Sequence, residues 1–265
     1  METWIRNRVD APAGVAHVAL ARPERRNALS AELVAELKDS LALAEADDRV
    51  RLVALSGEGK DFCAGADLEE VQEAVEDGVL ASLADAESLG ELFLLLRRME
   101  TPVVALVRGR ALAGGCGLAL ACDLVLASEE ARFGFPEVRL GFVPAMVMAI
   151  LRRSVGEKRA FELVALGDPV GAPAAREMGL VNRVFPEASF TSDAEGFVGA
   201  LAARSASAVA LTKRLLYQID GASFEAAIRA GAQVNALARL TDDCQAGIRE
   251  FLERRRGSGD RNGRS

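Results

Sequence analysis

The residues best suited to chemistry in this chain are one glutamate and the backbone N–H groups of a glycine-rich turn. Glu137 follows the segment 133–136 (Phe-Gly-Phe-Pro), and a carboxylate in such surroundings is a candidate general acid or base with a raised pKa. The run 113–117 (Ala-Gly-Gly-Cys-Gly) leads into the small, helix-compatible run 118–121. A turn that opens a helix leaves N–H groups free to bind an oxyanion. The same pattern also suits tight packing of a helix on a strand.

A second turn of the same kind lies earlier in the chain. The apolar run 52–55 (Leu-Val-Ala-Leu) is followed by a glycine-bearing loop, by 64–66 (Ala-Gly-Ala) and by Asp67, which suits the start of a helix. The chain therefore builds the order strand, loop, Ala-Gly and helix twice. Two such turns could direct their N–H groups at a single oxygen atom, which is what an oxyanion hole requires.

Hydrophobic periodicity predicts the elements that must hold these groups. Strands are expected at 15–20, 51–55, 103–107, 123–127, 132–135 and 180–185. Helices are expected at 31–46 after a Ser30 cap, from Asp67 to 98 with a break near Gly78, at 144–153, 157–166, 192–204, 206–218, 223–240 and 242–255. This alternation predicts an α/β protein with a helical C-terminal portion.

Other catalytic groups are scarce. His17 is the sole histidine and lies within the alternating strand 15–20, so it is interpreted as a structural strand residue. A catalytic pair that uses a second histidine and an HExxH zinc motif are both excluded. The cysteines are scattered without CxxC spacing and are interpreted as buried free thiols: Cys63, Cys116, Cys122 and Cys244. We therefore expect no metal site, and catalysis must come from carboxylates and backbone dipoles.

Composition narrows the functional class. The chain has 265 residues, is 50% hydrophobic and carries a formal net charge of −7. A general nucleic-acid binder is usually basic, so we expect no nucleic-acid partner. The N-terminal segment has no secretory pattern and no apolar run is long enough to span a bilayer, so we expect a cytoplasmic protein without membrane partners.

Five segments, in this order, resemble motifs of the enoyl-CoA hydratase/isomerase (crotonase) superfamily. They are 22–29 (Arg-Pro-Glu-Arg-Arg-Asn-Ala-Leu), 62–68 (Phe-Cys-Ala-Gly-Ala-Asp-Leu), 113–123 (Ala-Gly-Gly-Cys-Gly-Leu-Ala-Leu-Ala-Cys-Asp), 136–141 (Pro-Glu-Val-Arg-Leu-Gly) and 174–181 (Ala-Ala-Arg-Glu-Met-Gly-Leu-Val). The resemblance covers nearly the whole chain. It implies a crotonase-like spiral of ββα turns with a helical C-terminal trimerisation portion.

The resemblance also implies a domain organisation. Residues 1–190 would form the α/β core with the CoA and active site, and residues 191–254 the helical oligomerisation region of a homotrimer or a dimer of trimers. Residues 255–265 are expected to be a disordered tail.

Individual roles follow from the same resemblance. The N–H groups of Ala66 and Gly114 would bind the thioester oxygen of an acyl-CoA, and Glu137 would act as acid/base. Arg25, Arg26, Ala64, Ala66, Asp67, Leu68 and, from a neighbouring subunit, Arg254 are expected at the CoA. Coenzyme A is then part of the substrate, no separate cofactor is implied, and the setting would be fatty acid metabolism.

Gly117 departs from the family pattern. The well-known hydratases have a second glutamate at this position, and single-glutamate members include enoyl-CoA isomerases and a subgroup of hydratases. Three functions therefore stay open: a 2-enoyl-CoA hydratase, which is our main prediction, a Δ3-Δ2 enoyl-CoA isomerase, and a non-catalytic acyl-CoA or RNA-binding scaffold. For a hydratase we expect Gly117→Glu not to reduce activity, provided that the turn tolerates a Cβ.

Overall fold

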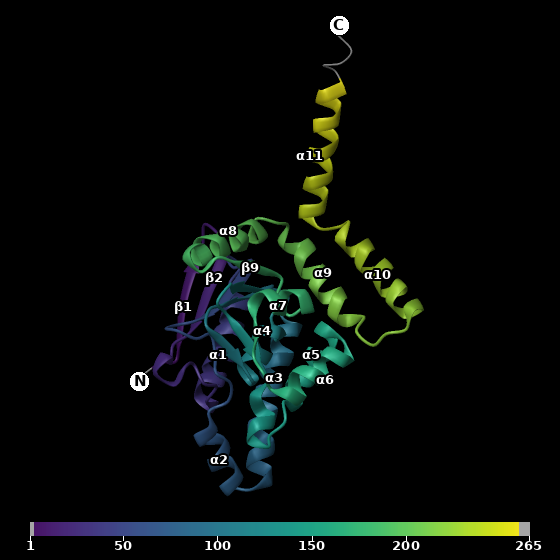
Figure 1. Cartoon of the computed structure of the whole chain (residues 1–265). Helices are drawn as coiled ribbons and strands as arrows, with labels where there is room; N and C mark the ends of the chain where they lie inside the picture. The colour runs from purple at the N-terminus through teal and green to yellow at the C-terminus, as the bar shows by residue number, and fades with distance from the viewer. Residues whose placement is uncertain (1–2, 260–265) are drawn as a thin grey trace. The chain divides into compact units, whose positions relative to one another are not determined.

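The computed structural model describes residues 3–259. The chain divides into two compact units, Met1–Leu201 and Ala202–Ser265. The first unit holds all the strands found in the described part of the chain, and the second is built from helices (Figure 1). The division falls at the end of a helix, Phe190–Ala202, rather than at the predicted boundary near residue 190.

The elements alternate along the chain. The strands are β1 (Ile5–Asp10), β2 (Val15–Leu20), β3 (Leu52–Gly57), β4 (Val103–Val107), β5 (Arg110–Leu112), β6 (Leu124–Ser128), β7 (Arg132–Gly134), β8 (Val170–Gly171) and β9 (Arg183–Phe185). The α-helices are α1 (Ala31–Ala46), α2 (Leu68–Glu76), α3 (Val79–Arg98), α4 (Gly114–Ala121), α5 (Ala145–Val155), α6 (Glu157–Leu166), α7 (Ala172–Met178), α8 (Phe190–Ala202), α9 (Ala206–Gln218), α10 (Phe224–Ala238) and α11 (Asp242–Gly259). Short 3₁₀ helices are η1 (Pro23–Arg25), η2 (Pro136–Leu140) and η3 (Glu187–Ser189).

The main sheet has six strands in the order β1-β2-β3-β4-β6-β9. β1 is antiparallel to β2, and each later neighbour pair is parallel. The carboxyl ends of β3, β4 and β6 therefore meet at one edge of the sheet, which is where open α/β sheets place their ligands. The segments that leave this edge lead to Ala66, Gly114 and Glu137.

A second set of pairings ties these three segments together. β5 pairs with β7 in parallel, so that Ala111 lies opposite Phe133. Isolated bridges join Cys63 to Ala111 and Leu29 to Ala66. Because Ala66 and Gly114 each lie three residues after a bridged position, the pairings bring both glycine-bearing turns to the same place.

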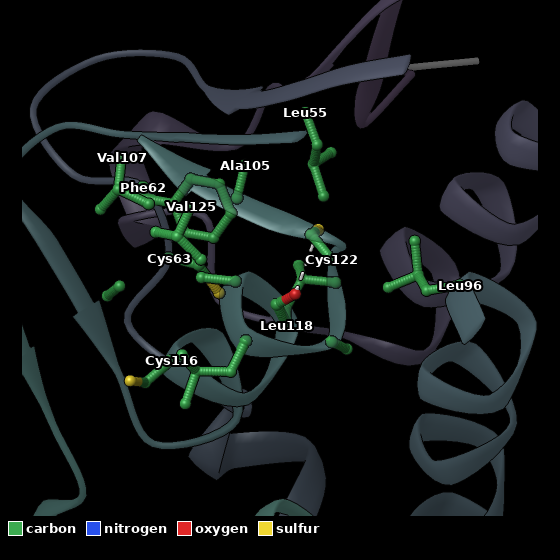
Figure 2. Close-up of a cluster of buried hydrophobic side chains, with 14 of the residues drawn as sticks. Leu55, Phe62, Cys63, Leu96, Ala105, Val107, Cys116, Leu118, Cys122 and Val125 are labelled. Carbon is green, nitrogen blue, oxygen red and sulfur yellow. Dashed lines mark hydrogen bonds between the residues drawn. The ribbon is translucent and has the colours of Figure 1, made fainter. Parts of the chain in front are cut away.

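The core lies between the main sheet and the helices that cover it. Helix α1 buries Leu33, Leu37 and Leu41 at four-residue spacing, and its N-cap Ser30 accepts a hydrogen bond from the Leu33 N–H. Side chains of β3, β4 and α4 form an apolar cluster in which the Cys122 thiol donates to the Leu118 carbonyl (Figure 2). Burial raises the pKa of the Cys63 thiol to about 12, so this cysteine is an inert core residue.

Most of the predicted elements are confirmed, several of them to the residue, such as Val15–Leu20, Ala31–Ala46 and Glu157–Leu166. The prediction of free cysteines is also confirmed for the described residues: three are buried and Cys244 is half-exposed. Helix α11 extends to Gly259, past the predicted start of the tail at residue 255, and the disorder of that tail stays a prediction. The rest of that tail lies outside the described residues.

Two further features of the described residues bear on function. No helix within residues 3–259 is long and apolar enough to cross a bilayer. In the second unit, α10 leaves Phe224, Ile228 and Leu237 exposed and buries Val234.

Candidate active site

The first glycine-bearing turn is held against the chain segment that precedes α1. The Leu29 N–H donates to the Gly65 carbonyl at 2.8 Å, and the Asp67 N–H donates to the Leu29 carbonyl at 3.1 Å. Ala66 lies between these two bonds, and its own N–H donates to no acceptor within residues 3–259. A small cavity of about 20 Å³ borders Ala66 and is lined also by Leu29 and Leu89. The turn therefore presents one free donor beside a cavity.

The second turn opens helix α4. Gly114 is the first residue of this helix, and the first N–H groups of a helix have no intrahelical acceptor. The preceding Ala113 has φ 51° and ψ −129°, a region that L-residues other than glycine seldom occupy. Its N–H donates to the Gly134 carbonyl at 2.9 Å. This strained turn is thus held in place by β7, the strand that leads to Glu137.

The two turns lie against each other. A Cβ built on Gly114 would lie 3.8 Å from the backbone nitrogen of Ala66 and 3.5 Å from methyl carbons of Leu29 and Leu89. A Cβ on Gly65 would lie 2.8 Å from the Cβ of Ala113, so the close approach requires glycine there. The two free N–H groups therefore lie within reach of one oxygen atom.

Glu137 lies in η2 and is 7% exposed. Its Oε2 is buried and has no hydrogen-bond partner among the described residues. Burial raises the pKa of this carboxyl above its ordinary value. The pKa of Cys116 on α4 is also raised, mainly by burial and further by the charge of Glu137. A partnerless buried carboxylate close to α4 has the properties of a general acid or base.

The space beside Gly117 is apolar. A Cβ on Gly117 would lie 2.5 Å from Cγ2 of Val147 and 3.0 Å from Cζ of Phe93. The condition attached to our Gly117→Glu expectation, tolerance of a Cβ, is therefore not met without movement of Val147. Local sequence patterns did not indicate Phe93 and Val147, because they reach α4 from two other helices.

Most of the residues expected at the CoA lie in the first compact unit, and only Arg254 among them lies in the second. Ala64 is joined to the N-terminal turn, because its N–H donates to the Arg26 carbonyl at 3.0 Å. The turn thus brings Arg25 and Arg26 beside Ala64 and Ala66, and both arginines are exposed. The Arg25 guanidinium donates to Glu69 at 2.9 Å. Of the other expected residues, Asp67 is buried and Leu68 is 58% exposed.

Arg254 lies on α11 in the second unit, where its guanidinium pairs with Glu250. Its contact with the CoA of a neighbouring subunit stays a prediction. Within the described residues, no group of three or more His, Cys, Asp or Glu side chains is arranged to hold a metal ion.

Asn27 holds the N-terminal turn in place through its side chain. The motif at 22–29 contains this residue but did not indicate its structural role. Asn27 is fully buried and has φ 55°. Its side chain accepts from the Arg22 N–H at 2.9 Å and donates to the carbonyls of Glu58 and Asp61 at 2.9 and 2.8 Å. Asn27 therefore joins the N-terminal turn to the loop that leads from β3 to Ala66.

Comparisons with known proteins agree with this arrangement. The family model for enoyl-CoA hydratase/isomerase matches residues 10–259. The chain is 44% identical over 241 residues to a Thermus thermophilus protein named for enoyl-CoA hydratase activity, covering 91% of this chain and 95% of that one. It is 36% identical over 239 residues to the 2,3-dehydroadipyl-CoA hydratase of Escherichia coli, covering 90% and 92%.

Solved structures give the same result for the fold. A Mycobacterium smegmatis enoyl-CoA hydratase superposes with a TM-score of 0.88 at 32% identity, covering 96% of this chain and 97% of that one. Human enoyl-CoA hydratase domain-containing protein 3 superposes with a TM-score of 0.90 at 27% identity, covering 95% and 98%. The crotonase-like fold expected from the motifs is thereby confirmed, and the chain belongs to the enoyl-CoA hydratase/isomerase family.

Proposed function

We propose that this protein adds water reversibly to the double bond of a 2-enoyl-CoA thioester. The observation that carries the proposal is the buried, partnerless Oε2 of Glu137, on the segment that β7 joins to the Gly114 turn. The hydratase names of the relatives agree with this reaction class. The CoA belongs to the substrate, and the reaction needs no metal or redox cofactor.

The proposed reaction uses one carboxylate twice. Glu137 accepts a proton from a water molecule while the water oxygen bonds to C3 of the enoyl group. The electron pair of the double bond moves toward C1, and negative charge develops on the thioester oxygen. The N–H groups of Ala66 and Gly114 stabilise this enolate, and one such donor contributes about 10²–10³ in rate. Protonated Glu137 then returns its proton to C2, which completes the addition of water.

An isomerase is the second candidate, and one observation favours it. The side chains of Phe93 and Val147 fill the space beside Gly117, so position 117 supplies no second polar group to hold a water. In an isomerase, Glu137 would take a proton from C2 and return it to C4, and the same two N–H groups would stabilise the dienolate.

Product analysis separates the candidates. The purified protein is incubated in turn with crotonyl-CoA, 3-hexenoyl-CoA and 3-methylglutaconyl-CoA, and the products are identified by mass spectrometry and by their chromatographic retention. A hydratase gives a product heavier by one water from at least one 2-enoyl substrate. A shifted double bond in 3-hexenoyl-CoA without any water addition contradicts the hydratase proposal, and no turnover at all favours the scaffold.

We propose further that the active protein is a cytoplasmic homotrimer or dimer of trimers. Exposed apolar side chains of the C-terminal helices and of the turn between α10 and α11 support self-association: Leu216, Phe224, Ile228, Leu237, Leu240, Ile248, Phe251 and Leu252. Burying such a surface against another copy is favourable. Light scattering at micromolar concentration tests this, and a monomeric mass contradicts it.

A further inference from the structure

Arg22 and Asp67 form an ion pair at the edge of the proposed oxyanion hole. Nη1 of Arg22 lies 2.7 Å from Oδ2 of Asp67, and the two side chains are 14% and 7% exposed. The guanidinium also stacks 5.4 Å from the ring centroid of Trp4. Exposed ion pairs contribute little, but removing one partner of a buried pair leaves an uncompensated charge. This pair is therefore a constraint on both segments that it joins.

One of those segments is the Ala66 turn. Asp67 follows Ala66 directly and caps helix α2, because its Oδ1 accepts from the Glu69 N–H at 3.1 Å. The backbone of Leu29 binds Gly65 and Asp67 on either side of Ala66. These bonds determine where the backbone of the turn lies. The contact with Arg22 determines the orientation of Asp67, which follows the Ala66 donor.

Arg22 is itself held firmly. Its N–H donates to Oδ1 of Asn27 at 2.9 Å, and Nη1 also reaches the Ala28 carbonyl at 3.5 Å. The indole of Trp4, on which the guanidinium stacks, donates through Nε1 to Glu32 at 3.1 Å. Because its contacts point to Asp67 and Trp4, this arginine differs from the exposed Arg25 and Arg26 of the same turn.

We propose that Arg22 is a positioning residue that, through Asp67, holds the N–H of Ala66 in the orientation needed to bind the thioester oxygen. The inference rests on the proposed function of the Ala66 N–H as an oxyanion donor. Hydrogen bonds weaken steeply when the donor tilts, and charge on the oxygen is larger in the transition state than in the bound substrate. Loss of the ion pair should therefore lower kcat more than it raises KM.

The test compares Arg22→Met and Asp67→Asn with the wild type. Asp67→Asn retains an oxygen that can cap α2 and removes the charge that pairs with Arg22. We expect each variant to lower kcat for hydration about 10-fold or more while KM changes less than about 3-fold. Arg22→Lys, which keeps the charge, should recover part of the loss. Arg49→Met is the matched control, because Arg49 pairs with Asp47 at the exposed surface.

A spectroscopic measurement reports on the donor itself. The infrared C=O stretch of bound butyryl-CoA, a saturated thioester that cannot be hydrated, shifts to lower frequency when the oxygen accepts strong hydrogen bonds. We expect a clear shift in the wild type, a smaller one in Arg22→Met and Asp67→Asn, and a wild-type shift in Arg49→Met. This readout distinguishes failure of the inference from failure of the proposed reaction, because it requires no water addition.

Three results would overturn the inference. The first is a folded Arg22→Met protein with wild-type kcat and a wild-type carbonyl shift. The second is a rise in KM alone, which would make Arg22 a binding residue for the CoA. The third is the absence of any carbonyl shift in the wild type, because Arg22 would then have no oxyanion hole to position. If Arg22→Met does not fold, Asp67→Asn and Arg22→Lys decide by the same two measurements.

Discussion

A Cβ on Gly117 would lie 2.5 Å from Cγ2 of Val147, closer than carbon atoms pack in folded proteins. The same Cβ would lie 3.0 Å from Cζ of Phe93. Position 117 is the one at which the resembled two-glutamate hydratases have a second carboxylate, and here the neighbouring helices have filled that space with apolar side chains. The single-carboxylate character of the site is therefore a property of its packing as well as of its sequence.

This packing predicts the cost of a side chain at position 117. Gly117→Ala should lower the free energy of unfolding by about 1–3 kcal/mol, because the core there has no room for a methyl group. Combining it with Val147→Ala should give a smaller total loss than the sum of the single losses. Urea titration of the four proteins measures this coupling, with Gly196→Ala as a control because nothing lies within 4 Å of its Cβ position. Strict additivity would contradict the contact.

Gly114→Ala should separate folding from catalysis. Its Cβ would make ordinary contacts at 3.5 Å with Leu29 and Leu89, so the Tm should stay close to that of the wild type. The same methyl group would lie 3.8 Å from the Ala66 nitrogen, where the substrate oxygen is proposed to bind. We expect kcat/KM for hydration to fall about 10²-fold or more. A folded variant with full activity would show that the oxygen binds elsewhere.

Asn27 should be the most sensitive polar residue of the N-terminal turn. Asn27→Ala removes three side-chain hydrogen bonds, one buried and two half-buried, and places alanine at φ 55°. We expect a loss of about 3 kcal/mol or more in unfolding free energy. Asn27→Gly loses the same bonds but tolerates the backbone angle, so it should be the milder of the two. Equal losses would mean that the backbone conformation contributes nothing, and a small loss in both would contradict the role of these bonds.

The pKa of Glu137 predicts a pH-dependent stability difference. Burial raises this pKa above the ordinary value of 4.5, so the folded protein binds the proton more tightly than the unfolded chain does. The stabilising effect of the protonated form is complete below the unfolded pKa and is lost as the pH rises toward the folded pKa. Glu137→Gln should therefore have a higher Tm than the wild type at pH 7, and this difference should shrink toward pH 4. Glu73→Gln, which changes an exposed carboxyl, should show no such trend, and a Glu137→Gln difference that is independent of pH would contradict the burial effect.

Local patterns predicted the elements that have strong local signals. Helix α1 has a serine cap and leucines at helical spacing, and β2 alternates between buried and less buried residues, so both were predicted to the residue. Strand β1 was missed because it is an edge strand whose residues are mostly exposed, with Ile5 alone buried. Strand β5 was missed because its three residues, Arg110–Leu112, are too few to show a period.

The candidate site also contains groups that local sequence patterns predicted and contacts that they did not. Glu137 and the two glycine-bearing turns were predicted from short segments, and the resemblance to the crotonase superfamily implied Ala66 and Gly114 as the donors within those turns. The contacts that position them join residues far apart in the chain, such as Arg22 with Asp67, and no local period reports such pairs. The steric environment of Gly117 depends likewise on the side chains that α3 and α5 direct toward α4. The groups that we propose to react were therefore indicated by the sequence, whereas the contacts that hold them in place required the structure.

The most direct test of the account is the hydration of crotonyl-CoA by the wild type and by Glu137→Gln. Loss of the enoyl-thioester absorbance gives the rate, mass spectrometry identifies the product, and a Tm for each protein confirms folding. We predict that the wild type forms 3-hydroxybutyryl-CoA and that Glu137→Gln lowers kcat by about 10²–10⁴ while still binding butyryl-CoA. A wild type that adds no water, or a folded Glu137→Gln protein that keeps the wild-type kcat, would contradict it.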